Sequence, residues 1–81
     1  MPKPRKSAFE EPYIAIIDRL IERRRELEMT QADLAKVYGE DQSFVSRIER
    51  RQRRLDVYEY VRFCRALEID PAAILRAIGP A

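Results

Sequence analysis

A glycine between two short apolar repeats constrains the fold of this chain more than any other feature. In each repeat the apolar side chains recur every three or four residues, which places them on one face of a helix. They are Leu34, Ala35 and Tyr38 before the glycine, and Phe44, Val45 and Ile48 after it. Gly39 can adopt a left-handed backbone at no steric cost and so end the first helix sharply. The segment predicts two short helices that cross closely at a tight turn, with the small Ala35 side chain at the crossing.

The rest of the chain also has the pattern of short amphipathic helices. Four of the expected helices follow a residue whose side chain can accept hydrogen bonds from the first free backbone N–H groups. These N-caps are Thr30, Asp41, Asp56 and Asp70. An earlier helix is expected from about Pro12 to Glu28, because proline suits a first-turn position, and the last helix should end at Gly79. The inner face of the helix after Asp56 is expected to hold Val57, Tyr60, Val61, Cys64 and Leu67. The predicted fold class is therefore all-α, a compact domain of five helices.

Length and composition narrow the possible functions. The 81 residues allow one small domain, which we expect over residues 12–79 after a flexible basic arm of residues 1–11. One cysteine and no histidine exclude an intramolecular disulfide and a Cys/His zinc site. No nucleophile can be paired with a base, so we expect no enzyme, cofactor or metal site. Residues 1–12 contain no apolar run of the kind found in a secretory signal, and no stretch approaches the roughly 18 to 20 apolar residues that span a membrane. We therefore expect a cytoplasmic protein.

The distribution of charge is more informative than its sum. The net charge is only +2, yet from Arg47 to Arg54 the chain carries five arginines and one acid, Glu49. This basic run begins within the second helix of the pair around Gly39. A clustered basic run is a typical electrostatic feature of nucleic-acid-binding proteins, although an isolated run is more often a solvated surface loop.

One long stretch of the chain resembles the lambda-repressor-like, or Cro/C1-type, helix-turn-helix family: MTQADLAKVYGEDQSFVSRIERRQRRLDVYEYVRFCRALEIDP. The resemblance extends from about Ile16 to Ile78. It is strongest at Thr30-Gln31, Leu34-Ala35, Gly39, Val45-Ser46-Arg47-Ile48-Glu49 and Ala66-Leu67. Glu40 and Asp41 depart from the family pattern, and two acids beside a DNA-facing surface would repel phosphate. The resemblance implies that the helix after Asp41 lies in the major groove of double-stranded DNA.

The first residues of a helix in the major groove point at the base edges. The expected base-contacting residues are Gln42, Ser43, Phe44, Ser46 and Arg47. The Gln42 amide can bond adenine in bidentate fashion, and Ser43 can donate or accept one hydrogen bond. Phe44 can contact a thymine methyl or pack in the core, and Arg47 can reach a guanine or a phosphate.

A second set of residues is expected to hold phosphates, which positions the protein on the duplex without reading sequence. It comprises Gln31, Arg50, Arg51, Arg53 and Arg54. Gln31 opens its helix, where the helix dipole favours an anion. The arginines lie beside the expected recognition helix, which favours a phosphate clamp over a merely solvated loop.

Two further predictions concern packing. Arg24 and Glu49 each fall on an apolar stripe, and because a lone buried charge is costly we expect a partly buried salt bridge between them. The family resemblance suggests the same pair. Related proteins usually associate through their last helix, which implies a dimer interface at Ile74, Leu75 and Ile78.

These features predict a sequence-specific, DNA-binding transcriptional regulator, either a repressor or a small controller protein. We expect it to bind a palindromic operator as a homodimer. No small-molecule ligand and no membrane partner are implied. Two alternatives stay open: a DNA-binding antitoxin that also binds a toxin, and a protein-interaction module that kept the fold but lost DNA binding. The two acids Glu40 and Asp41 are the best support for the interaction module.

Overall fold

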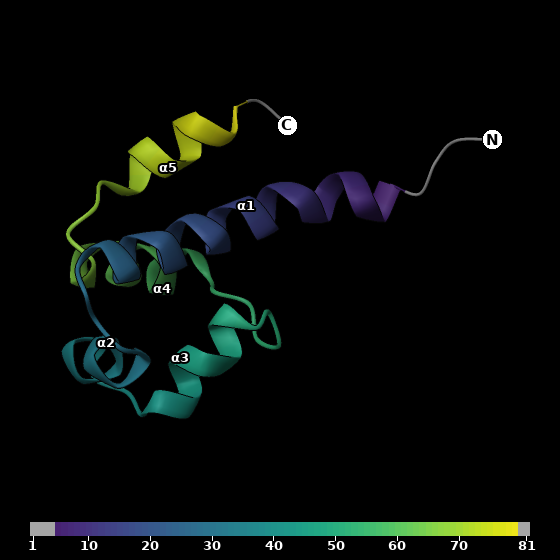
Figure 1. Ribbon diagram of the computed structural model, residues 1–81. Coiled ribbons are helices and arrows are strands. Elements are labelled where there is room, and N and C mark those ends of the chain that lie inside the picture. Colours follow the sequence, from purple (N-terminus) through teal and green to yellow (C-terminus); the bar gives the residue numbers. More distant parts are fainter. Residues whose placement is uncertain (1–4, 80–81) are drawn as a thin grey trace.

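The computed structural model describes residues 5–79, and all regular elements among them are helices (Figure 1). In chain order they are α1 (Arg5–Glu26), α2 (Gln31–Tyr38), α3 (Gln42–Glu49), α4 (Val57–Ala66) and α5 (Pro71–Ile78). The all-α, five-helix fold predicted from the sequence is confirmed. Within the described part of the chain, no helix combines the length and the apolar character needed to cross a membrane.

The four shorter helices begin at the predicted N-caps. At α2 the Thr30 hydroxyl accepts a hydrogen bond from the Asp33 N–H at 3.0 Å, and the Asp33 carboxylate accepts one from the Thr30 N–H at 2.9 Å. Asp56 and Glu59 form the same reciprocal arrangement at α4, with distances of 2.7 and 3.0 Å. The caps of α3 and α5 are Asp41 and Asp70. Satisfying these otherwise free N–H groups fixes where each helix starts.

The first helix differs from its prediction at both ends. It begins at Arg5 rather than near Pro12, so the proline lies inside the helix. Residues 5–11 are mostly good helix formers, which favour extension of the helix past a residue that lacks an N–H donor. At the other end Glu28 adopts a φ of 58°, a left-handed backbone that stops the helix two residues early. The predicted arm is therefore helical from residue 5 onward, and residues 1–4 lie outside the described residues.

All five helices contribute to one hydrophobic core. Its buried residues are Ile17, Leu20, Leu34, Ala35, Tyr38, Phe44, Val45, Ile48, Phe63, Cys64, Leu67 and Ile74. The apolar faces of α2 and α3 meet across the turn at Gly39, whose φ of 98° is the left-handed helix end predicted from the sequence. The pair lies on one side of α1 and α4, and α5 lies on the opposite side of α1 (Figure 1). This arrangement leaves one side of α3 free of other helices.

Only part of the predicted inner face of α4 is buried, since Cys64 and Leu67 lie in the core as predicted and Val57 does not. Phe63 and Cys64 lie in the core, whereas Val57 is 82% exposed and Val61 is half-buried. Val57 fits the helical repeat, but it is the first residue of α4 and lies beyond the closely packed core. Phe63 instead packs on Tyr38, with 4.8 Å between the ring centroids. The prediction was wrong for Val57 because a repeat identifies a helix face but not the point along the helix at which the core ends.

Candidate nucleic-acid interface

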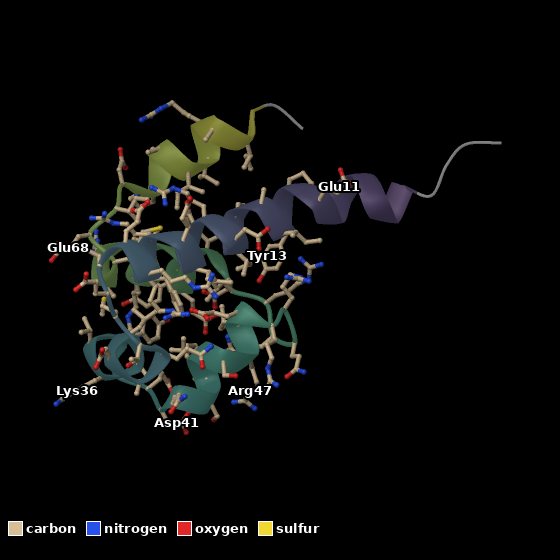
Figure 2. All side chains as sticks on the ribbon, viewed as in Figure 1. Glu11, Tyr13, Lys36, Asp41, Arg47 and Glu68 are labelled. Atoms are coloured by element: carbon tan, nitrogen blue, oxygen red, sulfur yellow. The ribbon has the colours of Figure 1, made fainter. Side chains whose placement is uncertain are left out.

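Helix α3 presents four of the five predicted base-contacting residues on its outer side. Gln42, Ser43 and Arg47 are exposed, and Ser46 is half-buried. Figure 2 shows Arg47 on the edge of α3 that points away from the other helices. The opposite side of α3 is buried through Phe44, Val45 and Ile48. Because these three apolar residues can face only the core, the polar residues between them must point outward.

Phe44 is the predicted base-contacting residue that the structure places elsewhere. It is only 6% exposed, its ring stacks on Tyr38 with 5.3 Å between centroids, and it lies 6.2 Å from the ring of Phe63. A contact with a thymine methyl would require this ring to reach the surface. Phe44 is therefore a core residue that anchors the first turn of α3.

Asp41 caps α3 and determines whether the Ser43 hydroxyl can donate a hydrogen bond to a ligand or accept one from it. The Asp41 Oδ1 accepts hydrogen bonds from the Ser43 hydroxyl at 2.9 Å and from the Phe44 N–H at 3.0 Å. These two bonds, the Ser43 hydroxyl first, hold the pKa of Asp41 below its ordinary value, so that the carboxylate stays ionised. Because Ser43 gives its only proton to Asp41, its hydroxyl presents acceptor lone pairs outward. The acid that departs from the family pattern thus stabilises the start of α3.

A buried ion pair links three helices at the other end of α3. Arg24 of α1 donates to Glu49 through Nε at 2.6 Å and through Nη2 at 3.0 Å, and the two side chains are 10% and 9% exposed. Arg24 also donates to the Met29 carbonyl oxygen at 2.7 Å. The Gln31 amide, at the start of α2, donates to the same Glu49 carboxylate at 2.9 Å. The structure therefore brings the predicted pair together and adds Gln31, so that α1, α2 and α3 share one network.

The start of α2 offers free backbone donors. The capping box uses the N–H groups of Thr30 and Asp33. Those of Gln31 and Ala32 have no hydrogen-bond partner among the described residues. Adjacent free N–H groups at the positive end of a helix dipole are suited to a phosphate oxygen. Since the Gln31 side chain is engaged with Glu49, its backbone is the part best placed to contact an anion.

The four loop arginines are not equivalent. Three of them are exposed: Arg50, Arg51 and Arg54. The guanidinium of Arg54 lies 4.5 Å from the ring centroid of Tyr13. Figure 2 shows Tyr13 on the side of α1 that faces the loop. Arg53 is half-buried and donates to both oxygens of Glu59, at 3.0 and 2.9 Å. Arg53 is thus engaged within the chain, a role that sequence reasoning missed because nothing in the run of arginines distinguishes it from its neighbours.

The predicted dimer residues lie in different environments. Ile74 is buried in the core and so offers almost no surface to a second chain. Leu75 is exposed and Ile78 is half-buried. Leu75 borders an apolar groove of about 210 Å³. The other residues lining this groove are Tyr13, Ile16, Leu55, Asp56, Val57 and Tyr60.

The fold and the outward-facing third helix define a helix-turn-helix domain. The profile of a helix-turn-helix family matches residues 20–74. A solved structure described as an XRE-family like protein from Pseudomonas syringae pv. tomato str. DC3000 is similar over 90% of this chain and 89% of that chain, with 42% sequence identity and a TM-score of 0.86. A comparison with curated proteins found no match. The chain belongs to the lambda-repressor-like, or Cro/C1-type, helix-turn-helix family of DNA-binding transcription regulators, which are generally not enzymes.

Proposed function

We propose that this protein regulates transcription by recognising a specific duplex sequence with the outer face of α3 in the major groove. The observation that carries the proposal is the fixed orientation of this helix, whose apolar side is buried while Gln42, Ser43 and Arg47 point outward. Gln42 can bond adenine and Arg47 can bond guanine, each in bidentate fashion. Ser43, as an acceptor, suits the amino group of cytosine or adenine. Ser46 completes this surface from a half-buried position.

Contacts to the phosphates would hold the duplex against this surface. We assign them to the free backbone N–H groups at the start of α2 and to the exposed arginines Arg50, Arg51 and Arg54. Such contacts supply affinity and register but no sequence preference. Arg53 is left out of this set because both of its terminal nitrogens already bond Glu59.

We further propose that the protein binds a palindromic operator as a homodimer, with half-sites about 34 to 36 Å apart. Leu75 and the apolar groove beside it support this part of the proposal, because exposed apolar surface favours association with another chain. Ile78 can contribute at the edge of the same helix. A dimer bound over a promoter would act as a repressor or small controller protein in the cytoplasm.

Selection of bound sequences from a pool of random duplexes tests the proposal directly. We expect enrichment of a palindrome, and an affinity that falls with salt at a log–log slope of about −0.9 for each phosphate contacted. Gln42→Ala should change the preferred sequence. The matched variant Arg50→Ala should instead weaken binding to all sequences alike and reduce the salt slope by about 1.

The same experiment identifies the main alternative. The exposed acids Glu40 and Asp41 favour a domain that kept the fold and lost DNA binding. No enrichment, together with binding that does not depend on salt, would support that alternative and contradict the proposed function.

A further inference from the structure

Five side chains form a continuous stack beneath the turn between α2 and α3. Their order is Arg53, Phe44, Tyr38, Arg62, Tyr58, so that arginines and aromatic rings alternate around a central pair of rings. The Arg53 guanidinium lies 4.7 Å from the ring centroid of Phe44, and that ring lies 5.3 Å from Tyr38. Arg62 lies 4.1 Å from Tyr38 and 5.9 Å from Tyr58. A cation over an aromatic face at such distances is attracted by the ring.

Helix α4 holds both arginines of this stack. Arg53 makes its two hydrogen bonds to Glu59, and Glu59 also accepts from the Asp56 N–H at 3.0 Å as part of the α4 cap. Arg62 belongs to α4 itself and donates to the Tyr38 carbonyl oxygen at 2.6 Å, where α2 ends. The paired rings of Tyr38 and Phe44 therefore lie between two arginines, and α4 holds both arginines in place.

The stack reaches the base-contacting turn through Phe44. This residue lies in the first turn of α3, directly after Gln42 and Ser43 in the chain. The planar guanidinium of Arg53 covers one face of the Phe44 ring while its forked N–H groups are held by Glu59. A lysine would keep the charge but lose both the planar contact and the two parallel hydrogen bonds.

We propose that Arg53 is a positioning residue for sequence recognition: held by Glu59 and stacked on Phe44, it fixes the direction of the first turn of α3 and contacts no phosphate. The inference rests on the proposed function, since it concerns how that function discriminates between sequences. Base contacts depend on precise orientation, whereas phosphate contacts carry no sequence information. Arg53 therefore governs the ratio of specific to non-specific affinity.

The test uses Arg53→Lys and Glu59→Gln, with Arg54→Lys as the matched control on an exposed loop arginine. Affinity is measured for the duplex that the wild type selects and for a scrambled duplex over a range of salt, at a temperature where thermal unfolding shows every variant to be folded. For both Arg53→Lys and Glu59→Gln we expect the specific affinity to fall about 5- to 100-fold, the loss of one well-placed base contact. In Arg53→Lys, which keeps the charge, affinity for the scrambled duplex and the salt slope should not change. Arg54→Lys should keep the specificity ratio.

Glu59→Gln separates positioning from phosphate binding. If Arg53 were a phosphate ligand, Glu59 would compete with the DNA phosphate for its guanidinium. Glu59→Gln would then strengthen binding to all sequences and leave the specificity ratio unchanged. In a positioning role the variant loses specificity, and the double variant Arg53→Lys/Glu59→Gln loses no more than either single one.

Three results would overturn the inference. An equal loss on both duplexes with a smaller salt slope for Arg53→Lys would make Arg53 a phosphate ligand. An unchanged specificity ratio in folded Arg53→Lys and Glu59→Gln would make the pair merely structural, while leaving the proposed function intact. Failure of the wild type to select any sequence would reject the proposed function and this inference together.

Discussion

Two arginine–glutamate pairs act on opposite ends of α3, and they differ in burial although their chemistry is the same. Arg24 and Glu49, at the C-terminal end, are 10% and 9% exposed. Arg53 and Glu59, which reach the N-terminal end through Phe44, are 40% and 18% exposed. In both pairs the guanidinium makes two hydrogen bonds to the carboxylate.

Burial decides what each pair contributes. Breaking a buried pair leaves a charge without water or a partner, so removing one member of the pair at Glu49 should strongly destabilise the fold. A half-exposed pair is screened by solvent and adds little to folding. We infer that the pair at Arg53 instead orients the first turn of α3, because the Arg53 guanidinium also covers the Phe44 ring in that turn. We therefore expect the buried pair to act mainly on stability and the half-exposed pair mainly on recognition.

Glu49→Ala should give the largest effect on stability and is the strongest test of this distinction. The variant leaves Arg24 buried without its partner and deprives the Gln31 amide of its acceptor. We expect the free energy of unfolding to fall by about 3 to 5 kcal/mol, measured by urea or thermal denaturation. In a domain of this size such a loss approaches the whole stability.

The control for this prediction is Glu26→Ala, which removes an exposed carboxylate that pairs with two half-buried arginines of α1, Arg19 and Arg23. We expect a loss below about 1 kcal/mol. If Glu49→Ala cost no more than Glu26→Ala, burial would not be what distinguishes the two kinds of pair.

The buried pair and most of the fold were predictable because their signals are local in the sequence. N-caps act on residues two or three positions further on, so Thr30 and Asp56 predicted where α2 and α4 begin. The left-handed turn followed from the identity of Gly39 alone. Arg24 and Glu49 could be paired because each interrupts an apolar stripe, and a buried charge needs a partner of opposite sign.

The pair of Arg53 and Glu59 was not predictable, because the path of the loop determines which acid Arg53 faces. Arg51 adopts a φ of 62°, unusual for a residue other than glycine, and this turns the chain so that Arg53 faces Glu59. Sequence position alone assigns the same surface role to each arginine of the loop. A related reason explains Ile74, which was predicted at the dimer interface and lies in the core. The apolar repeat of α5 identifies one face of the helix but does not indicate how much of that face the domain itself covers.

Glu59→Ala should have an intermediate effect and tests the other half of the comparison. It removes the partner of Arg53 and one of the two hydrogen bonds of the α4 capping box. We expect a loss of about 1 kcal/mol in the free energy of unfolding, most of it from the cap. Glu22→Ala, which breaks only an exposed pair with Arg19, should stay within about 0.5 kcal/mol of the wild type. A loss at Glu59 as large as that at Glu49 would remove the division between stability and recognition.

Acid titration should give the smallest effect, and it tests whether the pKa of Glu59 is lowered in the folded chain, as the half-exposed pair requires. The hydrogen bonds from Arg53, and then from the Asp56 N–H, lower the pKa of Glu59 from its ordinary value of 4.5. Because the pKa is lower in the folded than in the unfolded chain, this stabilisation is complete above 4.5 and is lost as the pH falls through the folded-state pKa. Glu59→Gln cannot titrate, so its free energy of unfolding should fall less than that of the wild type between about pH 7 and about pH 3. Asp33 and Asp41, whose pKa values are also lowered, titrate in both proteins and cancel in the difference. Equal acid sensitivity of the two proteins would mean that Arg53 does not hold Glu59, and the role assigned to Arg53 would lose its physical basis.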